Sequence, residues 1–413
     1  MPTDRDILHA LFQAALKVAL PDGRFAGRLP LPPPGRTIVL GAGKASARMA
    51  QAFEAEWPHS CEGLVVTRYG HAAKTRHVEV VEAAHPVPDE AGRRAAQRIL
   101  DLATSAGPDD LVVALISGGA SALLSLPATG VTLQDKQEIN RALLTSGAPI
   151  GEMNRVRKAL SAIKGGRLAL AAQPARVVTY LISDVPGDDP ATIGSGPTIP
   201  EVSDPEVALG ILHAYAISVR PEVLAAIRAN AVLRPAPPAE VHMLATPWMA
   251  LAAAAETARG FGLTPLILGD AIEGEAREVA RVLAGITASV VAHRQPAARP
   301  CVLLSGGETT VTVRGRGRGG RNAEFLLALA LALNGTPRVA AIACDTDGID
   351  GSEDNAGAWF DDKLLDAART AKVDLAHHLA GNDAYTAFQA LDRLVVTGPT
   401  LTNVNDFRAI LVR

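Results

Sequence analysis

The chain has 413 residues, a formal net charge of −3, 48% hydrophobic residues and 4% aromatic residues. This length predicts two domains with sizeable cores, and the near-neutral charge argues against a general nucleic-acid-binding or membrane-surface protein. Three widely spaced cysteines, no signal-peptide pattern and no apolar run near the ~20 residues of a membrane span predict a soluble, cytoplasmic protein.

Apolar, β-branched segments alternate with helical patterns along most of the chain. They are 37–41, 63–67, 110–119 and 176–185, then 264–270, 301–307, 338–348, 393–400 and 408–413. Strands separated by helices predict βαβ units, a parallel sheet and ligands beyond the carboxyl ends of the strands.

A proline-rich break at 234–241 predicts the domain boundary. We expect an N-terminal Rossmann-like α/β domain over 1–236 and a second, smaller α/β domain over 237–413. The alternating "TTVTV" (309–313) predicts a hairpin, and therefore a mixed sheet in the second domain.

The first loop that could do chemistry is "IVLGAGKASARMA" (38–50). Gly41 and Gly43 would let the backbone approach an anion at a helix N-terminus, and Lys44 adds positive charge. A turn that only packs the helix is the alternative. Ser46 replaces the third glycine of the dinucleotide fingerprint, and the strand "GLVVTRYG" ends without the ribose-binding acid, which disfavours a nicotinamide site.

The second loop is "ISGGASALL" (116–124), after an apolar strand. Ser117, Gly118, Gly119 and Ser121 could offer backbone N–H groups and hydroxyls to a carboxylate or phosphate. A tight turn without a ligand is the alternative, and a serine nucleophile is disfavoured because the GxSxG pattern is absent.

A charged helical stretch, "RVRKALSAIKGGRLA" (155–169), follows later. Lys164 precedes two glycines that cost helix stability, so it is a candidate phosphate ligand. A solvated helix face is the alternative.

Two acidic loops follow strands. "ISDVPGDDPATIGSGPT" (182–198) carries three aspartates together with Ser195 and Thr198. Asp184 and Asp189 are candidates for Mg²⁺ binding or for accepting a proton from an attacking hydroxyl. Turn capping by the aspartates is the alternative.

The other acidic loop, "ACDTDGIDGSEDNAG" (343–357), fails as a calcium loop because Ile349 and Ala356 occupy ligand positions. Asp347 and Asp350 stay candidates for metal or ribose contact, with an acidic surface turn as the alternative.

The segment "RGRGRGGRN" (314–322) concentrates positive charge between an apolar strand and a helix. Arg321 and Asn322, at the expected helix start, are candidates for binding an anion. The other arginines are expected to project from a solvated hairpin end. An RNA-binding tether over 314–321 is the rival interpretation.

Near the C-terminus, Thr400 and Asn403 belong to a polar loop between two apolar strands, together with Thr397, Asn405 and Asp406. The loop suits recognition of a small hydroxyl-rich molecule, or it satisfies its own backbone. Glycine-bearing anion loops, acidic loops and the lack of a redox centre together favour phosphoryl transfer.

These motifs resemble the family of glycerate kinases that phosphorylate the 2-hydroxyl and carry a C-terminal MOFRL domain. The resemblance runs over nearly the whole chain, through "GAGKA", "SGGASALL", "RKALSAIKGG", "SDVPGDDPATIGSGPT", "GGETTVTVRGRGRGGRNAE", "DTDGIDG" and "TGPTLTNVND". It implies a kinase that uses ATP and a divalent metal such as Mg²⁺ to convert D-glycerate to 2-phosphoglycerate. It also implies a MOFRL region over about 300–410 and an active site in an interdomain cleft.

The family's key lysine and arginine fall on Lys44 and Arg321, and Glu308 of "GGET" joins the candidates for substrate binding. The chain departs from the family pattern at Asp345 and Leu401, where many members carry glycine. Asp347 is therefore a better candidate than Asp345.

Some relatives carry the name hydroxypyruvate reductase, so an NAD(P)H-dependent reductase is the alternative function. In that case "GAGKAS" would be the nucleotide turn, and Arg68 would read a phosphate. We expect a small-molecule substrate and a nucleotide as partners, with no nucleic acid and no membrane. A homodimer is left open.

Overall fold

The computed structural model describes residues 2–233, 236–238 and 240–413, which form two compact units. The Rossmann-like unit contains Pro21–Ser183 and Asp188–Leu244. The mixed-sheet unit contains Met1–Leu20, Asp184–Gly187 and Ala245–Arg413. The boundary expected within 234–241 includes residues 234, 235 and 239, which lie outside the described residues, so the domain limits stay a prediction.

The described part of the Rossmann-like unit is built on six strands in the order β3-β2-β1-β4-β5-β6. The pairings from β3 to β5 are parallel, as the alternation of strands and helices predicts. The strands are β1 (Thr37–Ala42), β2 (Glu62–Arg68), β3 (Val78–Ala83), β4 (Leu111–Ser117), β5 (Arg176–Ile182) and β6 (Glu240–Ala245). The central strands β1 and β4 are buried along their whole lengths, so both faces of the sheet are covered.

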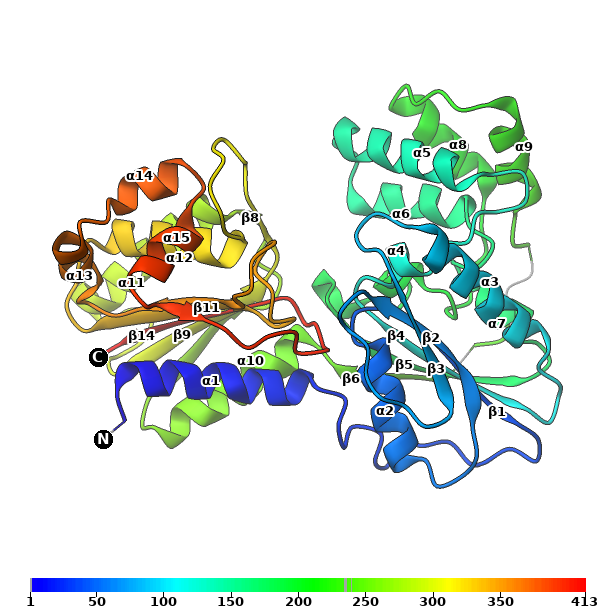
Figure 1. The fold of residues 1–413 in the computed structure, drawn as a ribbon, viewed down its shortest axis with the longest axis horizontal. Helices are drawn as coiled ribbons and strands as arrows, with labels where there is room; N and C mark the ends of the chain where they lie inside the picture. Colours follow the sequence, from blue (N-terminus) through cyan, green and yellow to red (C-terminus); the bar gives the residue numbers. More distant parts are fainter. Residues whose placement is uncertain (1, 234–235, 239) are drawn as a thin grey trace. The chain divides into compact units, whose positions relative to one another are not determined.

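Two groups of helices belong to this unit (Figure 1). Next to the sheet lie α2 (Ser46–Glu56), α3 (Glu90–Thr104) and α4 (Ala120–Leu123), and α7 (Arg167–Ala171) packs against α3. A separate helical layer with its own apolar core contains α5 (Leu133–Ser146), α6 (Ile150–Ala159), α8 (Pro205–Ala214) and α9 (Pro221–Ala229). The expected helical stretch 155–169 is interrupted, because α6 ends at Ala159 and Lys164 lies in the turn that its two glycines allow.

The mixed-sheet unit contains a sheet in the order β13-β12-β11-β14-β9-β7. Strands β7 and β9 are parallel, whereas the pairings from β9 through β14, β11 and β12 to β13 are antiparallel. The strands are β7 (Thr264–Gly269), β9 (Cys301–Gly307), β11 (Val339–Asp345), β12 (Gly357–Phe360), β13 (Leu394–Val395) and β14 (Asp406–Val412). The predicted mixed sheet is therefore confirmed.

The predicted hairpin at 309–313 is wrong. Only β10 (Thr309–Thr310) forms there, and it pairs in parallel with β8 (Gly274–Glu275) in a separate two-stranded sheet. The large sheet is mixed because β12 and β14 reverse direction.

Helices cover both faces of the mixed sheet (Figure 1). On one face α1 (Asp4–Ala19) packs against α10 (Pro247–Gly260), and on the other α11 (Ala276–His293) packs against α12 (Arg321–Leu333). Three shorter helices complete this unit: α13 (Leu364–Ala371), α14 (Leu375–Ala380) and α15 (Ala384–Ala390). No helix in the described residues has the length and hydropathy of a membrane span.

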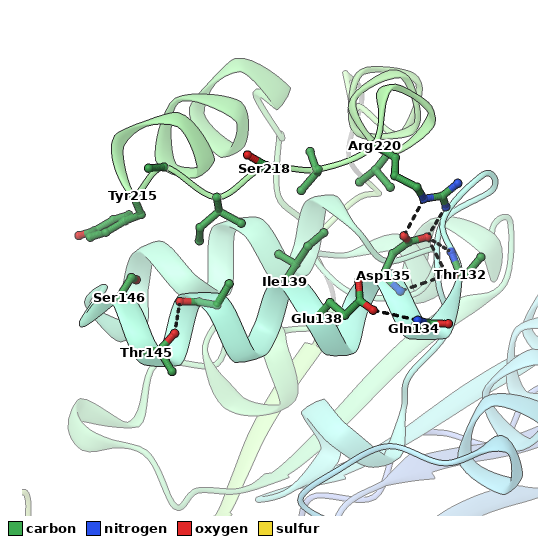
Figure 2. A pocket seen from close by; sticks show the side chains of 15 residues that line it. Thr132, Gln134, Asp135, Glu138, Ile139, Thr145, Ser146, Tyr215, Ser218 and Arg220 are labelled. Carbon is green, nitrogen blue, oxygen red and sulfur yellow. Dashed lines mark hydrogen bonds and ion pairs between the residues drawn. The ribbon is translucent and has the colours of Figure 1, made fainter.

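A hollow of about 820 Å³ lies between α5 and the segment 215–223, and an ion pair stands at one end of it (Figure 2). Asp135 closes a capping box with Thr132 at the start of α5. Its carboxylate also accepts hydrogen bonds from Arg220, at 2.6 Å from Nη2 and 3.0 Å from Nε. The hydrogen bonds from Arg220 and Thr132 outweigh burial and hold the pKa of Asp135 well below its usual range.

We predict that Asp135→Ala destabilises the protein by about 1–2 kcal/mol, because the helix loses its cap and Arg220 loses its partner at a partly exposed site. The pKa of Asp135 is lower in the folded state than in the unfolded state. The stabilisation by its carboxylate is therefore fully present above the unfolded pKa of about 4 and is lost as pH falls through the folded-state pKa. Urea unfolding should show the difference between wild type and variant narrowing below about pH 4. The exposed Glu138→Ala on the same helix is the control and should change stability little.

Candidate functional site

The loops after β1 and β4 meet where the strand order of the Rossmann-like unit reverses, the usual ligand position in such sheets. Gly43 has φ +131°, and a Cβ there would lie 2.1 Å from Ser117 Oγ and 2.6 Å from Ser117 O. Only glycine fits this approach. Lys44 N donates to Gly118 O (2.8 Å), and Ala45 N donates to Ser117 Oγ (3.0 Å), so the two loops are joined.

The side chain of Lys44 lies beside Gly119. A Cβ on Gly119 would come within 3.3 Å of Lys44 Cγ and 3.1 Å of His85 Nε2. The imidazole of His85 therefore also borders this loop. The sequence did not reveal His85 as a candidate, because His85 follows β3, a strand that was not among the expected elements. The pattern "VEVVEA" was the signal that could have predicted this strand.

Three further predicted residues come together just beyond Gly119. Ser121 Oγ lies 2.7 Å from Ser195 Oγ, and Lys164 Nζ donates to Ser121 O (2.5 Å) and Ser121 Oγ (3.1 Å). Burial, together with nearby Lys136 and Arg157, holds the pKa of Lys164 well below its usual range. The buried Lys164 thus contacts Ser121 in the loop after β4, although the two residues are 43 positions apart in sequence.

Two residues of the first motif have structural roles. Ser46 is buried, and its hydroxyl donates to Gly43 O (2.9 Å) or Val66 O (2.8 Å), so the side chain completes the turn where a dinucleotide fingerprint has glycine. Gly41 allows β1 to approach β4, since a Cβ there would lie 2.5 Å from Leu115 O.

The two proposed metal ligands have different surroundings. Asp184 belongs to the mixed-sheet unit, where Asn403 Nδ2 donates to its Oδ2 (3.0 Å) and Asn405 Nδ2 donates to its carbonyl. Asp189 caps its own turn, accepting from Ala191 N (3.0 Å) and Thr192 Oγ1 (2.9 Å). Within 2–233, 236–238 and 240–413, no group of three or more His, Cys, Asp or Glu is arranged to hold a metal ion.

Arg321 is the centre of a charge cluster in the mixed-sheet unit. Its Nε donates to Asp406 (2.8 Å), its Nη1 to Glu308 (2.8 Å) and its Nη2 to Asp345 (2.9 Å). The cluster forms because β14 runs antiparallel to β9 and β11, so Asp406 begins its strand at the edge where the other two end.

Burial of the Arg321 guanidinium acts to lower its pKa, but the three carboxylates outweigh burial and raise it. In this structure Arg321 therefore forms ion pairs with carboxylates of its own chain. Binding of a substrate anion by Arg321 would require the displacement of one of them. Glu308 has the most exposed of the three carboxylates, at 50% against 6% for Asp345 and 0% for Asp406.

The remaining candidates surround this cluster. Asp347 N donates to Asp345 Oδ1 (3.0 Å), and Thr400 N donates to Asp347 O (3.1 Å). Asn322 Nδ2 donates to Asp406 Oδ1 (2.7 Å). Asp345, ranked behind Asp347 in the sequence analysis, thus pairs with Arg321 together with Asp406.

The "RGRGRGG" loop is not the end of a hairpin, which corrects the expectation, but Arg314, Arg316 and Arg318 are exposed to solvent as expected. A Cβ on Gly315 would lie 2.1 Å from Gly381 O, and one on Gly317 would lie 2.4 Å from Asp383 Cβ. The glycines therefore let the loop pack against 381–383. Arg318 lies over the ring of Tyr385, 4.4 Å from its centroid.

Comparison with known proteins gives two family matches. Residues 7–228 match the family described as "Domain of unknown function (DUF4147)", and residues 301–406 match the MOFRL family. A protein of Agrobacterium vitis named "Putative hydroxypyruvate reductase" is 53% identical over 99% of this chain and 94% of its own length.

D-glycerate 2-kinase of Thermotoga maritima is 38% identical over 96% of this chain and 95% of its own length. The crystal structure of a glycerate kinase from the same organism has a TM-score of 0.91 and 37% identity, covering 98% of this chain and 99% of that one.

We predict that Gly43→Ala destabilises the Rossmann-like unit by roughly 2–5 kcal/mol, because the methyl group would overlap Ser117 at a positive φ. Gly210→Ala is the control: nothing lies within 4 Å of its added Cβ on the exposed side of α8, and it should stabilise by about 0.5–1 kcal/mol. Thermal unfolding of both variants measures the difference. An unfolding midpoint of Gly43→Ala equal to wild type would contradict the close approach.

Proposed function

Because the chain belongs to the glycerate kinase family that carries a MOFRL domain, we propose that it transfers the terminal phosphoryl group of ATP to the 2-hydroxyl of D-glycerate. The product would be 2-phosphoglycerate. The single observation that carries the proposal is the junction of the β1 and β4 loops, which fixes Lys44 beside Gly119 at the topological switch point.

Lys44 and the loop after β4 suit the phosphates of the nucleotide. The glycines leave room for an anion to approach the main chain, and the lysine supplies a full positive charge. Phosphoryl transfer depends mainly on positioning and on neutralising charge at the transferring group. Lys44 would neutralise charge in the transition state, and Gly118 and Gly119 would hold phosphate oxygens.

Arg321 would bind either the carboxylate of glycerate or the transferring phosphoryl group. The guanidinium is suited to either because it presents paired donors to two oxygens at once. The ion pair between Glu308 and Arg321 would break when the substrate anion replaces the Glu308 carboxylate. Asp347, Thr400 and Asn403 would border the hydroxyl-rich substrate.

Mg²⁺ needs only one or two carboxylates when phosphate oxygens and waters complete its coordination. Such an ion would neutralise charge on the phosphates. We propose Asp184 as the first carboxylate for it, since Asp189 uses both carboxylate oxygens in its own turn. Either aspartate could instead orient the attacking hydroxyl.

We predict that Lys44→Ala and Arg321→Ala each lower kcat/KM for ATP and D-glycerate on the order of 10³, since each removes a charge that acts in the transition state. Phosphorus NMR of the reaction measures turnover and distinguishes esterification at position 2 from position 3. The exposed Lys74→Ala serves as the control and should turn over like wild type. Wild-type turnover in both test variants would defeat the assignment.

A second candidate is an NAD(P)H-dependent hydroxypyruvate reductase, favoured by the printed name of the Agrobacterium vitis relative. Ser46 speaks against it, because the buried hydroxyl occupies the position of the fingerprint's third glycine. Purified protein with hydroxypyruvate and NADH or NADPH tests it. Loss of nicotinamide absorbance at a rate proportional to enzyme would favour the reductase over the kinase.

A further inference from the structure

A cavity of about 340 Å³ lies under the loop that follows β4, and all its lining residues belong to the Rossmann-like unit. The predicted residues Gly119, Ser121 and Lys164 form part of its wall. Lys136 of α5 and Arg157 of α6 form another part, and neither was a candidate from the sequence. Leucines and Ile139 from the helical layer form an apolar part of the wall, and the segment 85–88 also lines the cavity.

The polar wall of this cavity is cationic. It contains Lys136, Arg141, Arg157 and Lys164, and the lining residues include no aspartate or glutamate. Arg157 is held by two asparagines of the helical layer, with Nε donating to Asn140 Oδ1 (2.8 Å) and Nη1 to Asn154 Oδ1 (3.2 Å). The guanidinium is thus oriented by neutral groups that leave its charge uncompensated.

Lys136 is the most unusual member of the wall. Its Nζ is buried and has no hydrogen-bond partner among the described residues. Burial lowers the pKa of Lys136 to about 8. An ammonium removed from water without a partner is costly, and here Lys136 and the buried Lys164 lie near enough to repel each other. The helix has no need of a charge at this position, since Ile139 and Leu143 provide its apolar core contacts.

We propose that this cavity binds a phosphate group and that Lys136, Lys164 and Arg157 are its ligands. A doubly charged phosphate compensates several cations at once and has enough oxygens to accept from all three side chains. The identity of that ligand rests on the proposed function: it is either ATP or the phosphorylated hydroxy acid, both of which carry the phosphate that the cavity recognises.

The experiment compares the intact wild-type protein with Lys136→Met, whose unbranched side chain is one atom shorter and carries no charge. Inorganic phosphate, ATP and 2-phosphoglycerate are titrated separately by calorimetry, and thermal unfolding is recorded with and without phosphate. The exposed Lys74→Met of the same unit is the matched control.

For Lys136→Met we expect at least a tenfold loss of phosphate affinity and a smaller phosphate-induced rise of the unfolding temperature. Without phosphate the variant should unfold at the same or a higher temperature, because a buried unpaired charge has been removed. Lys74→Met should behave as wild type. A second variant, Lys136→Gln, should show the same loss of affinity and guards against a folding defect peculiar to methionine.

The three ligands distinguish the sources of the phosphate. If the loss for inorganic phosphate is accompanied by a loss for ATP alone, the cavity belongs to the nucleotide. If it is accompanied by a loss for 2-phosphoglycerate alone, the cavity belongs to the acid. Equal affinities of wild type and both variants for all three ligands would overturn the inference. Phosphate binding that depends on Lys136 in a protein without kinase turnover would refute the proposed function and leave the phosphate site standing.

Discussion

The approach of Gly43 to Ser117 is the constraint on which the rest of the Rossmann-like site depends. A separation of 2.1 Å between a hypothetical Cβ and the serine oxygen means that no other residue can occupy position 43 without moving β1 from β4. Because the loops are in contact, Lys44 N reaches Gly118 O and Ser117 Oγ reaches Ala45 N. These bonds set the start of α4, whose Ser121 meets the buried Lys164.

The two units balance charge in opposite ways. In the Rossmann-like unit the cavity below the β4 loop collects cations and has no acid in its wall, so an external anion is what would neutralise it. In the mixed-sheet unit, Arg321 is surrounded by three carboxylates of the chain itself. The first arrangement suits the phosphates of a nucleotide or product. The second orients the arginine through acids of the chain itself.

Most of the strands, the parallel sheet and the loops that hold Gly43 and Ser121 could be predicted, because each depends on a local pattern of apolar runs, glycines and hydroxyls. The strands β3, β6 and β12 were missed. Lys136 could not be predicted, since it sits in an ordinary amphipathic helix and becomes unusual only when α6 and the β4 loop pack against it. Likewise the Arg321–Asp406 pair joins residues 85 positions apart through an antiparallel strand order that the sequence does not reveal. The predicted hairpin at 309–313 is wrong, because the alternating residues there include a short strand that belongs to a separate two-stranded sheet.

The glycines and the arginines before α12 are explained by two different features of the structure. Gly315 and Gly317 are needed because the loop lies directly on residues 381–383, where a side chain would collide. Of the arginines, Arg321 alone reaches the cluster of Asp345, Asp406 and Glu308, while Arg318 packs on Tyr385. Within that cluster the buried aspartates cannot leave without exposing the arginine's charge to an apolar interior, whereas the half-exposed carboxylate of Glu308 can be rehydrated at little cost. Exchange of Glu308 for a ligand anion is therefore the lowest-energy way in which this arginine could bind a substrate.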